Sequence, residues 1–289
     1  MNFAGIRTKM EHNAVGRSTI RVLRGIGAVH VLHTVKAGKA RKKFMNQKNS
    51  FAKFYDINKA EFDRVYDILE DEISRKTYKA IIDFRQTYDI KLLNRVYEKK
   101  QYFLKEILPP KENEVFIDGG AYIGDTALDF LKNYQEGSSY KMYLWEPDKR
   151  NAEQICKLLG RAKNYKIIPL AMWNGKDSLS FSADGAGTSA VGINGSAVDA
   201  DSIDNLHSDE QVTFIKMDIE GAEIEALKGA EKTIKRCKPK LAICIYHEYE
   251  HLYKIPMMIK EMVPEYKLYM RHHSDTSSET VIYACVEGM

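Results

Sequence analysis

Acidic side chains and one histidine follow several apolar, strand-like runs of this sequence. Asp118 ends the run "VFID", Glu146 follows "MYLW", Asp218 follows "TFIKM" and His247 follows "AICIY". The carboxyl ends of parallel strands meet at one edge of a sheet, so these groups are expected to lie close together. Carboxylates there can accept hydrogen bonds from ligand hydroxyls, and an imidazole can take a proton from a hydroxyl near neutral pH. The pattern predicts a site that binds a polar ligand and transfers a proton.

A glycine-rich turn after Asp118 narrows the choice of ligand. Gly119 and Gly120 let the backbone approach a ligand, Gly124 lets a helix begin tightly against the strand, and free N–H groups there favour an anion. The spacing "DGGAYIGDT" is neither the G-x-G-x-x-G dinucleotide fingerprint nor a P-loop. Glu146, at the end of the next strand, can accept hydrogen bonds from both ribose hydroxyls. A nucleoside with a small carboxylate and no diphosphate is expected, and S-adenosylmethionine fits this description.

Alternating strand and helix patterns must position these residues. Predicted strands are Val115–Asp118, Lys141–Trp145, Tyr165–Leu170, Val212–Asp218 and Leu241–Tyr246, with helices from near Gly124, Asp148 and Gly221. Such alternation predicts a mostly parallel sheet with helices on both faces. The last two strand-like runs, "EYKLYMRHH" and "ETVIYACV", are joined by a short polar loop. They are expected to pair as an antiparallel hairpin.

The preceding part of the chain has a helical pattern. Asn58 and Glu61 resemble a capping box at a helix start, and apolar residues then recur on one face. These apolar residues are Phe62, Val65, Leu69 and Ile73. The prolines of "ILPPKENE" cannot continue a helix, so a domain boundary is expected there. Three regions result: a basic arm (1–50), a helical region (51–110) and the main α/β domain (111–289).

The basic arm differs in charge from the rest of the chain. Residues 1–50 contain eleven Lys or Arg and one Glu, a net +10, which leaves −6 for the remainder of a chain whose total is +4. Gly25, Gly27 and Gly38 disfavour a long helix, so a solvated tail or a broken helix is expected. Contact with an anionic membrane surface is favoured over a nucleic-acid arm as a function. The four scattered cysteines lack a Cys-x-x-Cys pair, and no run could serve as a signal peptide or span a bilayer. A cytoplasmic, membrane-peripheral location is expected.

From about Gln101 onward the chain resembles the FkbM family of S-adenosylmethionine-dependent methyltransferases. The resemblance rests on "VFIDGGAYIGDT", "WEPD", "PLAMWN", "VDADSIDNL", "FIKMDIEGAEIEALKGA", "LAICIYH" and "YMRHHSDTSSETVIYA", in this order. It implies a class I (Rossmann-like) methyltransferase fold, with a seven-stranded, mostly parallel sheet that ends in the hairpin. It also implies O-methylation, commonly of a sugar or another secondary metabolite.

The resemblance also assigns roles to residues. The implied cofactor-binding residues are Asp118, Gly119, Gly120, Ala121, Gly124 and Glu146, with Met172 or Trp173 near the adenine. Asp218 would close the site over the methionine end and His247 would face the acceptor. The family often has Lys and Asp where this chain has Glu248 and His251, which bears on the acceptor. Asp218, Glu220 and His247 could bind a metal, but their spacing matches no trusted ligand motif, so no metal site is predicted.

The expected chemistry is an in-line displacement that moves the methyl group to a hydroxyl oxygen of a small molecule or glycan. His247 is the candidate base and Asp218 the candidate orienting group. Two alternatives stay open. The first is a nucleic-acid methyltransferase guided by the basic arm, which ranks lower because the chain has no Asn-Pro-Pro-Tyr-type motif. The second is a non-catalytic partner subunit that keeps the fold, against which the intact glycine turn, Glu146 and Asp218 argue.

Overall fold

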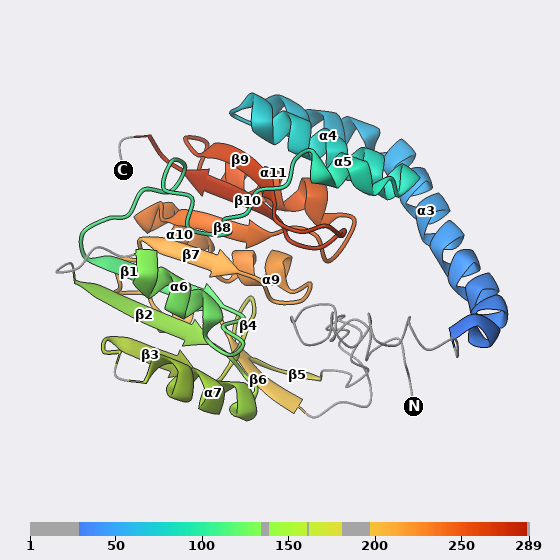
Figure 1. Cartoon of the computed structure of the whole chain (residues 1–289). Coiled ribbons are helices and arrows are strands. Elements are labelled where there is room, and N and C mark those ends of the chain that lie inside the picture. Colours follow the sequence, from blue (N-terminus) through green and yellow to red (C-terminus); the bar gives the residue numbers. More distant parts are fainter. Residues whose placement is uncertain (1–28, 134–138, 161, 181–196, 288–289) are drawn as a thin grey trace.

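A seven-stranded sheet forms the centre of the molecule (Figure 1), with strand order β3-β2-β1-β7-β8-β10-β9. The computed structural model describes residues 29–133, 139–160, 162–180 and 197–287. The strands are β1 Glu114–Gly119, β2 Tyr140–Trp145, β3 Tyr165–Ile168, β7 Phe214–Met217, β8 Lys240–Cys244, β9 Lys267–His272 and β10 Thr280–Cys285. β1, β2, β3, β7 and β8 run parallel, whereas β10 pairs antiparallel with both β8 and β9. The predicted fold class and its C-terminal hairpin are confirmed.

Helices cover both faces of this sheet (Figure 1). The helices after the glycine turn are α6 Asp125–Asn133, α7 Lys149–Leu159, α8 Ile203–Leu206, α9 Glu223–Lys228, α10 Glu231–Cys237 and α11 His251–Met262. Alternate residues of β1 divide between the faces, since Phe116 packs in the cluster that contains α6 and α7 and Ile117 packs in the cluster that contains α9, α10 and α11. Both faces are therefore buried, as expected for parallel strands.

The helix predicted to begin near Gly221 starts at Glu223 and is divided in two. Gly229 separates α9 from α10, and a Cβ added there would lie 2.1 Å from the carbonyl oxygen of Trp173. Only glycine allows this close approach of two backbones. A small sheet of order β4-β6-β5, formed by β4 Ala171–Met172, β5 Asp177–Ser180 and β6 Ala197–Asp201, was not predicted. Its strands, AM, DSLS and AVDAD, contain no apolar run that would identify them in the sequence.

The N-terminal helices are α3 Val29–Ile68, α4 Glu72–Thr87 and α5 Ile90–Asn94. The predicted capping box is wrong, because Asn58 lies inside α3 and its side-chain amide donates to the carbonyl oxygen of Phe54 at 2.8 Å. Leu69 is buried as expected, but Ile73 is 57% exposed. Asp71 caps a new helix between them by accepting a hydrogen bond from the Ser74 N–H at 2.7 Å, which breaks the expected face.

These helices share one hydrophobic core with the sheet. Phe62, Val65 and Tyr78 belong to the same buried cluster as Ile243 of β8 and Met270 of β9. The region thus packs over one end of the sheet. α3 continues through Gly38, so the expected break at this glycine is wrong.

The remaining predictions for the basic arm concern residues 1–28 and the side chains of residues 29–48, which lie outside the described part. Within the described residues, no helix has the length and apolar character that crossing a bilayer requires.

Candidate active site

The glycine turn lies at the carboxyl end of β1, between the ends of β2 and β7. The N–H groups of Gly120 and Ala121 donate to the carbonyl oxygen of Trp145 at 3.1 and 3.0 Å. Gly120 and Gly124 have φ angles of 72° and 89°, in the left-handed region that favours glycine. A Cβ at Gly120 would lie 2.0 Å from the carbonyl oxygen of Asp218. The turn therefore requires glycine for both its backbone angles and its packing.

A buried ion pair between Asp118 and Lys216 stabilises the glycine turn. Lys216 of β7 lies with its Nζ 2.9 Å from Oδ1 of Asp118, and both side chains are almost fully buried. The same ammonium donates to the carbonyl oxygens of Gly119 and Gly120, each at 3.1 Å. Burial raises the pKa of Asp118 despite the attraction of Lys216. Burial also disfavours the charge of Lys216, but the carboxylates of Asp118 and Asp218 raise the pKa of this lysine above its ordinary value.

Glu146 joins the turn to the end of β2. Its Oε2 accepts a hydrogen bond from the Tyr122 N–H at 2.9 Å, and its Oε1 accepts from the Asp148 N–H at 2.8 Å. Burial raises the pKa of this carboxyl, and the donated hydrogen bonds oppose that effect. Each carboxylate oxygen has two lone pairs, so Glu146 can still accept hydrogen bonds from a ligand.

The two residues suggested for the adenine pocket lie in different surroundings. Met172 packs on the glycine turn, since a Cβ at Gly119 would lie 2.7 Å from its sulfur. Trp173 donates its N–H to the carbonyl oxygen of Asp201 at 2.9 Å, and its own carbonyl oxygen faces Gly229. The contacts of Met172 thus join it to the turn, whereas those of the Trp173 backbone connect the small sheet to the junction of α9 and α10.

Asp218 follows β7 on the other side of the glycine turn. Its N–H donates to the carbonyl oxygen of Gly119 at 3.1 Å. Tyr246 donates its phenolic hydrogen to Oδ1 at 2.9 Å, and Tyr102 donates to Oδ2 at 3.1 Å. Burial would raise the pKa of Asp218, but Lys216, His247 and the Tyr246 hydroxyl together lower it. The carboxylate is therefore ionised at neutral pH and held from two sides.

His247 lies among carboxylates at the end of β8. Its Nδ1 is 3.0 Å from Oε1 of Glu223, and its Nε2 is 3.5 Å from Oδ1 of Asp218 and 3.6 Å from Oε2 of Glu220. Burial lowers the pKa of this imidazole, but Glu223 and the other two carboxylates outweigh burial and raise it to about 9. The imidazole is thus protonated at neutral pH.

The structure brings together the glycine turn, Glu146, Met172, Asp218 and His247, and it adds residues that were not predicted. These are Lys216, Tyr102, Tyr246, Glu223 and His251. The sequence does contain a signal for Lys216, because a lysine inside the apolar run "TFIKM" is buried with the strand and needs a partner of opposite charge. Tyr102 had none, since 116 positions of the sequence separate it from Asp218.

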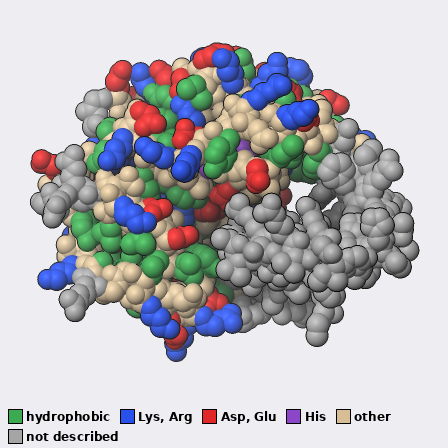
Figure 2. All heavy atoms as spheres, in the orientation of Figure 1, with side chains coloured by type: hydrophobic (Ala, Val, Ile, Leu, Met, Phe, Trp, Pro, Cys, Tyr) green, Lys and Arg blue, Asp and Glu red, His purple; other side chains and the backbone are tan. Residues whose placement is uncertain are grey.

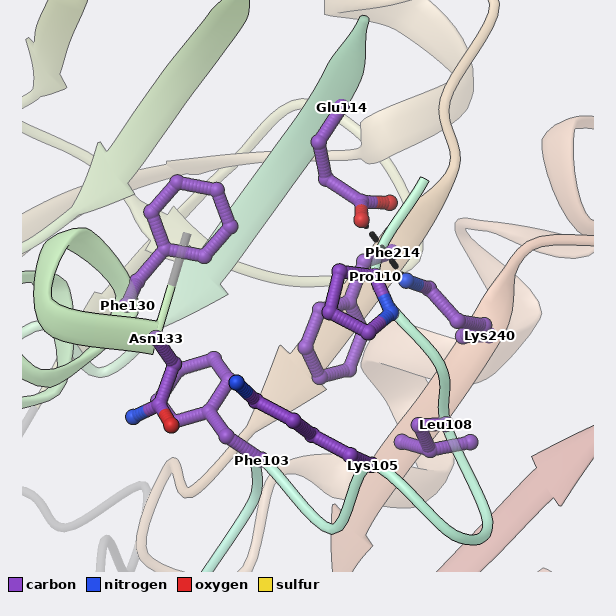
Figure 3. A pocket seen from close by; sticks show the side chains of 9 residues that line it. All are labelled: Phe103, Lys105, Leu108, Pro110, Glu114, Phe130, Asn133, Phe214 and Lys240. Atoms are coloured by element: carbon purple, nitrogen blue, oxygen red, sulfur yellow. Dashed lines mark hydrogen bonds and ion pairs between the residues drawn. The ribbon is translucent and has the colours of Figure 1, made fainter. Parts of the chain in front are cut away.

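Acidic side chains gather in a hollow beside the grey residues, over the region where β7 ends (Figure 2). A second, small pocket lies at the opposite, amino-terminal edge of the sheet (Figure 3). Phe103, Phe130 and Phe214 line this pocket, and Lys240 pairs there with Glu114 at 2.7 Å. The pocket is thus separate from the residues predicted for the active site.

Comparison with known proteins agrees with this geometry. Residues 118–274 match the methyltransferase FkbM domain. The methyltransferase FkbM structure from Methylobacillus flagellatus KT has 27% identity and a TM-score of 0.70, and the match covers 80% of this chain and 59% of that chain. This chain therefore spans less than two thirds of that protein.

More distant matches include two structures from other organisms. Aeropyrum pernix fibrillarin with bound S-adenosyl-L-methionine has 13% identity and a TM-score of 0.40, with coverage of 60% and 67% of the two chains. Precorrin-6y C5,15-methyltransferase from Geobacter metallireducens GS-15 has 10% identity and a TM-score of 0.41, with coverage of 68% and 96%. No curated protein matches the sequence.

Proposed function

The chain belongs to the FkbM family of methyltransferases, and we propose that it transfers a methyl group from S-adenosylmethionine to a hydroxyl oxygen of a sugar, a glycan or a related secondary metabolite. The observation that carries this proposal is the position of Asp218. Its backbone bonds to the glycine turn, while its ionised carboxylate lies 3.5 Å from His247. An acceptor at this carboxylate would be next to the cofactor turn.

S-adenosylmethionine is the cofactor of this family, and the residues present fit it. The tight turn at Gly120 leaves no space for a side chain, so the backbone itself can approach a ligand closely. Glu146 would accept hydrogen bonds from the ribose hydroxyls, and Met172 would pack near the adenine. The sulfonium supplies an electrophilic methyl group when the cofactor is bound. The chain must then hold the acceptor oxygen in line with that methyl group, and such alignment can contribute on the order of 7–11 kcal/mol.

The pKa of His247 changes the expected division of roles between His247 and Asp218. A histidine with a pKa of about 9 carries a proton at neutral pH and cannot accept another. Asp218 is ionised and has lone pairs left beside those used by Tyr102 and Tyr246. We therefore assign Asp218 as the group that accepts the hydroxyl hydrogen, and His247 as the cation that orients this carboxylate.

A carboxylate is a sufficient proton acceptor for this reaction. The acceptor hydroxyl becomes strongly acidic as its oxygen bonds to the methyl carbon, because the oxygen gains positive charge. A group with a low pKa can take the proton at that stage, and it remains ionised at neutral pH before the reaction. The lowered pKa of Asp218 meets both needs.

Calorimetric titration with S-adenosylhomocysteine tests the cofactor part of the proposal. We expect saturable binding by the wild-type chain, a large loss of affinity in Glu146→Ala and no loss in the control Glu153→Ala, an exposed position on α7. A panel of sugars and glycans with radiolabelled methyl donor then tests the acceptor class. A folded chain that binds no S-adenosylhomocysteine would contradict the proposal and favour the non-catalytic partner subunit.

The location of the enzyme forms a separate part of the proposal. We place it in the cytoplasm, at anionic membrane surfaces contacted by the net +10 charge of residues 1–50. Vesicle sedimentation with phosphatidylserine or with phosphatidylcholine alone tests this contact. Equal binding to both vesicle types by the full chain would rule it out.

A further inference from the structure

Glu223, His247 and His251 form a buried cluster beside Asp218. Glu223 opens α9, His247 follows β8 and His251 opens α11. Their side chains are 0%, 5% and 2% exposed, respectively. Oε1 of Glu223 lies 3.0 Å from Nδ1 of His247, and Oε2 lies 3.4 Å from Nδ1 of His251. One nitrogen or oxygen from each residue lies within 4.8 Å of the other two.

Polar atoms of this cluster are buried without hydrogen bonds. They are Oε2 of Glu223, both ring nitrogens of His247 and Nδ1 of His251. Burying such atoms without partners is costly. A proton on His247 can neutralise the charge of Glu223 through Oε1. It leaves Oε2 and the His251 nitrogen facing each other with no hydrogen bond between them.

A shared metal ion would satisfy these atoms together. In a tetrahedral site with ligands at about 2.0–2.1 Å, two ligand atoms are about 3.3 Å apart. Oε1 of Glu223 lies 3.0 Å from His247 and Oε2 lies 3.4 Å from His251, so a rotation of the carboxylate and shifts of the two rings would seat an ion between the three side chains. Two imidazoles and one carboxylate suit zinc, cobalt and other transition metals better than calcium or magnesium. We propose that Glu223, His247 and His251 bind one divalent transition-metal ion, of the zinc or cobalt class.

The surroundings of the cluster match those of metal ligands. Oε1 of Glu223 accepts a hydrogen bond from the Ile219 N–H at 2.9 Å, which fixes the carboxylate. The outward Nε2 of His247 faces Asp218 and Glu220 at 3.5 and 3.6 Å. Metal-bound histidines commonly direct their second ring nitrogen at a carboxylate, which fixes the tautomer. The ion would take the place of the proton on Nδ1 and keep the N–H at Nε2 directed at Asp218, so a neutral, metal-bound His247 would orient this carboxylate in place of the imidazolium assigned above.

The spacing of the two histidines has a different meaning here from that in metalloproteases. The residues 247–251 read "HEYEH", which matches H-E-x-x-H in sequence. That motif requires both histidines on one helix face, but α11 begins only at His251. The third group is therefore Glu223 from another element. The site is unlike a protease centre, in which the Glu inside the motif acts as general base.

Metal binding by the full, tag-free chain tests this proposal. The protein is freed of metal with a chelator and titrated with Co²⁺, while visible absorption reports ligand-field bands and Zn²⁺ competes for the ion. We expect one equivalent to bind, with affinity reduced by about a hundredfold or more in Glu223→Gln and in His251→Gln. Glu250→Gln, beside His251 but outside the cluster, should bind as the wild type does.

X-ray absorption and thermal unfolding test which atoms bind the ion. X-ray absorption of the zinc-loaded chain should show only nitrogen and oxygen ligands, at about 2.0–2.1 Å. Zn²⁺ should also raise the thermal midpoint of the wild type but not that of Glu223→Gln. A folded wild-type chain that binds neither ion, sulfur among the ligands, or unchanged binding in both glutamine variants would overturn the proposal. These readouts need no methyl donor, so they are independent of the proposed methyl transfer.

Discussion

Tyr102 donates a hydrogen bond from its phenol to Oδ2 of Asp218 at 3.1 Å, across 116 positions of the sequence. Tyr102 precedes the segment 118–274 that matches the family domain, and it lies in the connection between the N-terminal helices and β1. Its ring also lies beside the ammonium of Lys216, 5.3 Å from the ring centroid. A residue outside the matched domain thus contacts two charged groups of the site.

Removing the Tyr102 hydroxyl should reduce methyl transfer while leaving cofactor binding intact. A hydrogen bond to a charged group is worth about 1.5–3 kcal/mol, so Tyr102→Phe should lower turnover by roughly tenfold or more. The remaining ring keeps the contact with Lys216. Turnover and S-adenosylhomocysteine affinity are measured side by side, with Tyr253→Phe as the control. Equal turnover of wild type and Tyr102→Phe would show that Asp218 needs no support from this phenol.

Breaking the Asp118–Lys216 pair should strongly destabilise the fold. Lys216→Met leaves the carboxylate of Asp118 buried without its cation. Removing one partner of a buried ion pair lowers the free energy of unfolding by about 3–5 kcal/mol. The carbonyl oxygens of Gly119 and Gly120 also lose their shared donor. Urea denaturation measures the change in the free energy of unfolding. Lys235→Met, whose side chain is 51% exposed, should change stability little, and a similar loss in both variants would refute the special role of Lys216.

Gly120→Ala should abolish cofactor binding because the site has no room for a methyl group. The added Cβ would lie 2.0 Å from the Asp218 carbonyl oxygen, at a φ of 72° that disfavours a side chain. Backbone strain of this kind costs on the order of 1–3 kcal/mol even before the clash. Gly175→Ala is the matched control, since nothing lies within 4 Å of its Cβ position. Calorimetry that detects wild-type affinity in Gly120→Ala would show that the turn is more plastic than its packing indicates.

Stability should fall in mild acid because buried neutral histidines must gain protons. Burial lowers the pKa of His207, His272 and His273 from 6.5 to about 4. Between these values the unfolded chain binds more protons than the folded chain. Stability therefore rises with pH across this range and is lost as pH falls from about 6.5 toward 4. Urea midpoints measured between these pH values test the sign of this dependence.

His273 offers a clean variant for this test. Its Nδ1 lies 2.9 Å from the carbonyl oxygen of Glu98, so it carries the hydrogen, and its Nε2 accepts from the Tyr283 hydroxyl at 2.8 Å. Glutamine can donate and accept in a similar manner but does not titrate in this range. The slope of the free energy of unfolding against pH depends on how many more protons the unfolded chain binds. We expect His273→Gln to reduce this slope by the contribution of one histidine. An unchanged slope would mean that His273 is not among the groups responsible.

Much of the fold follows from local patterns in the sequence. Buried parallel strands require long apolar runs, and Asp148 is a favourable cap, so β1, β2, β7, β8 and the start of α7 were predictable. The end of α3 was not, because the apolar period continues past Leu69 while Asp71 starts a new helix. The small sheet was missed because its strands, AM, DSLS and AVDAD, contain no apolar run.

For the active site, the sequence by itself determined which groups come to the carboxyl edge of the sheet. Strand ends and glycine spacing place Asp118, Glu146, Asp218 and His247 there, since these features are local. Only the tertiary structure decided what each group does. Asp118 has its own buried lysine, and Glu223 from another element raises the pKa of His247. Charge and burial depend on neighbours brought together by packing, so a residue's type and spacing do not specify its protonation or its role.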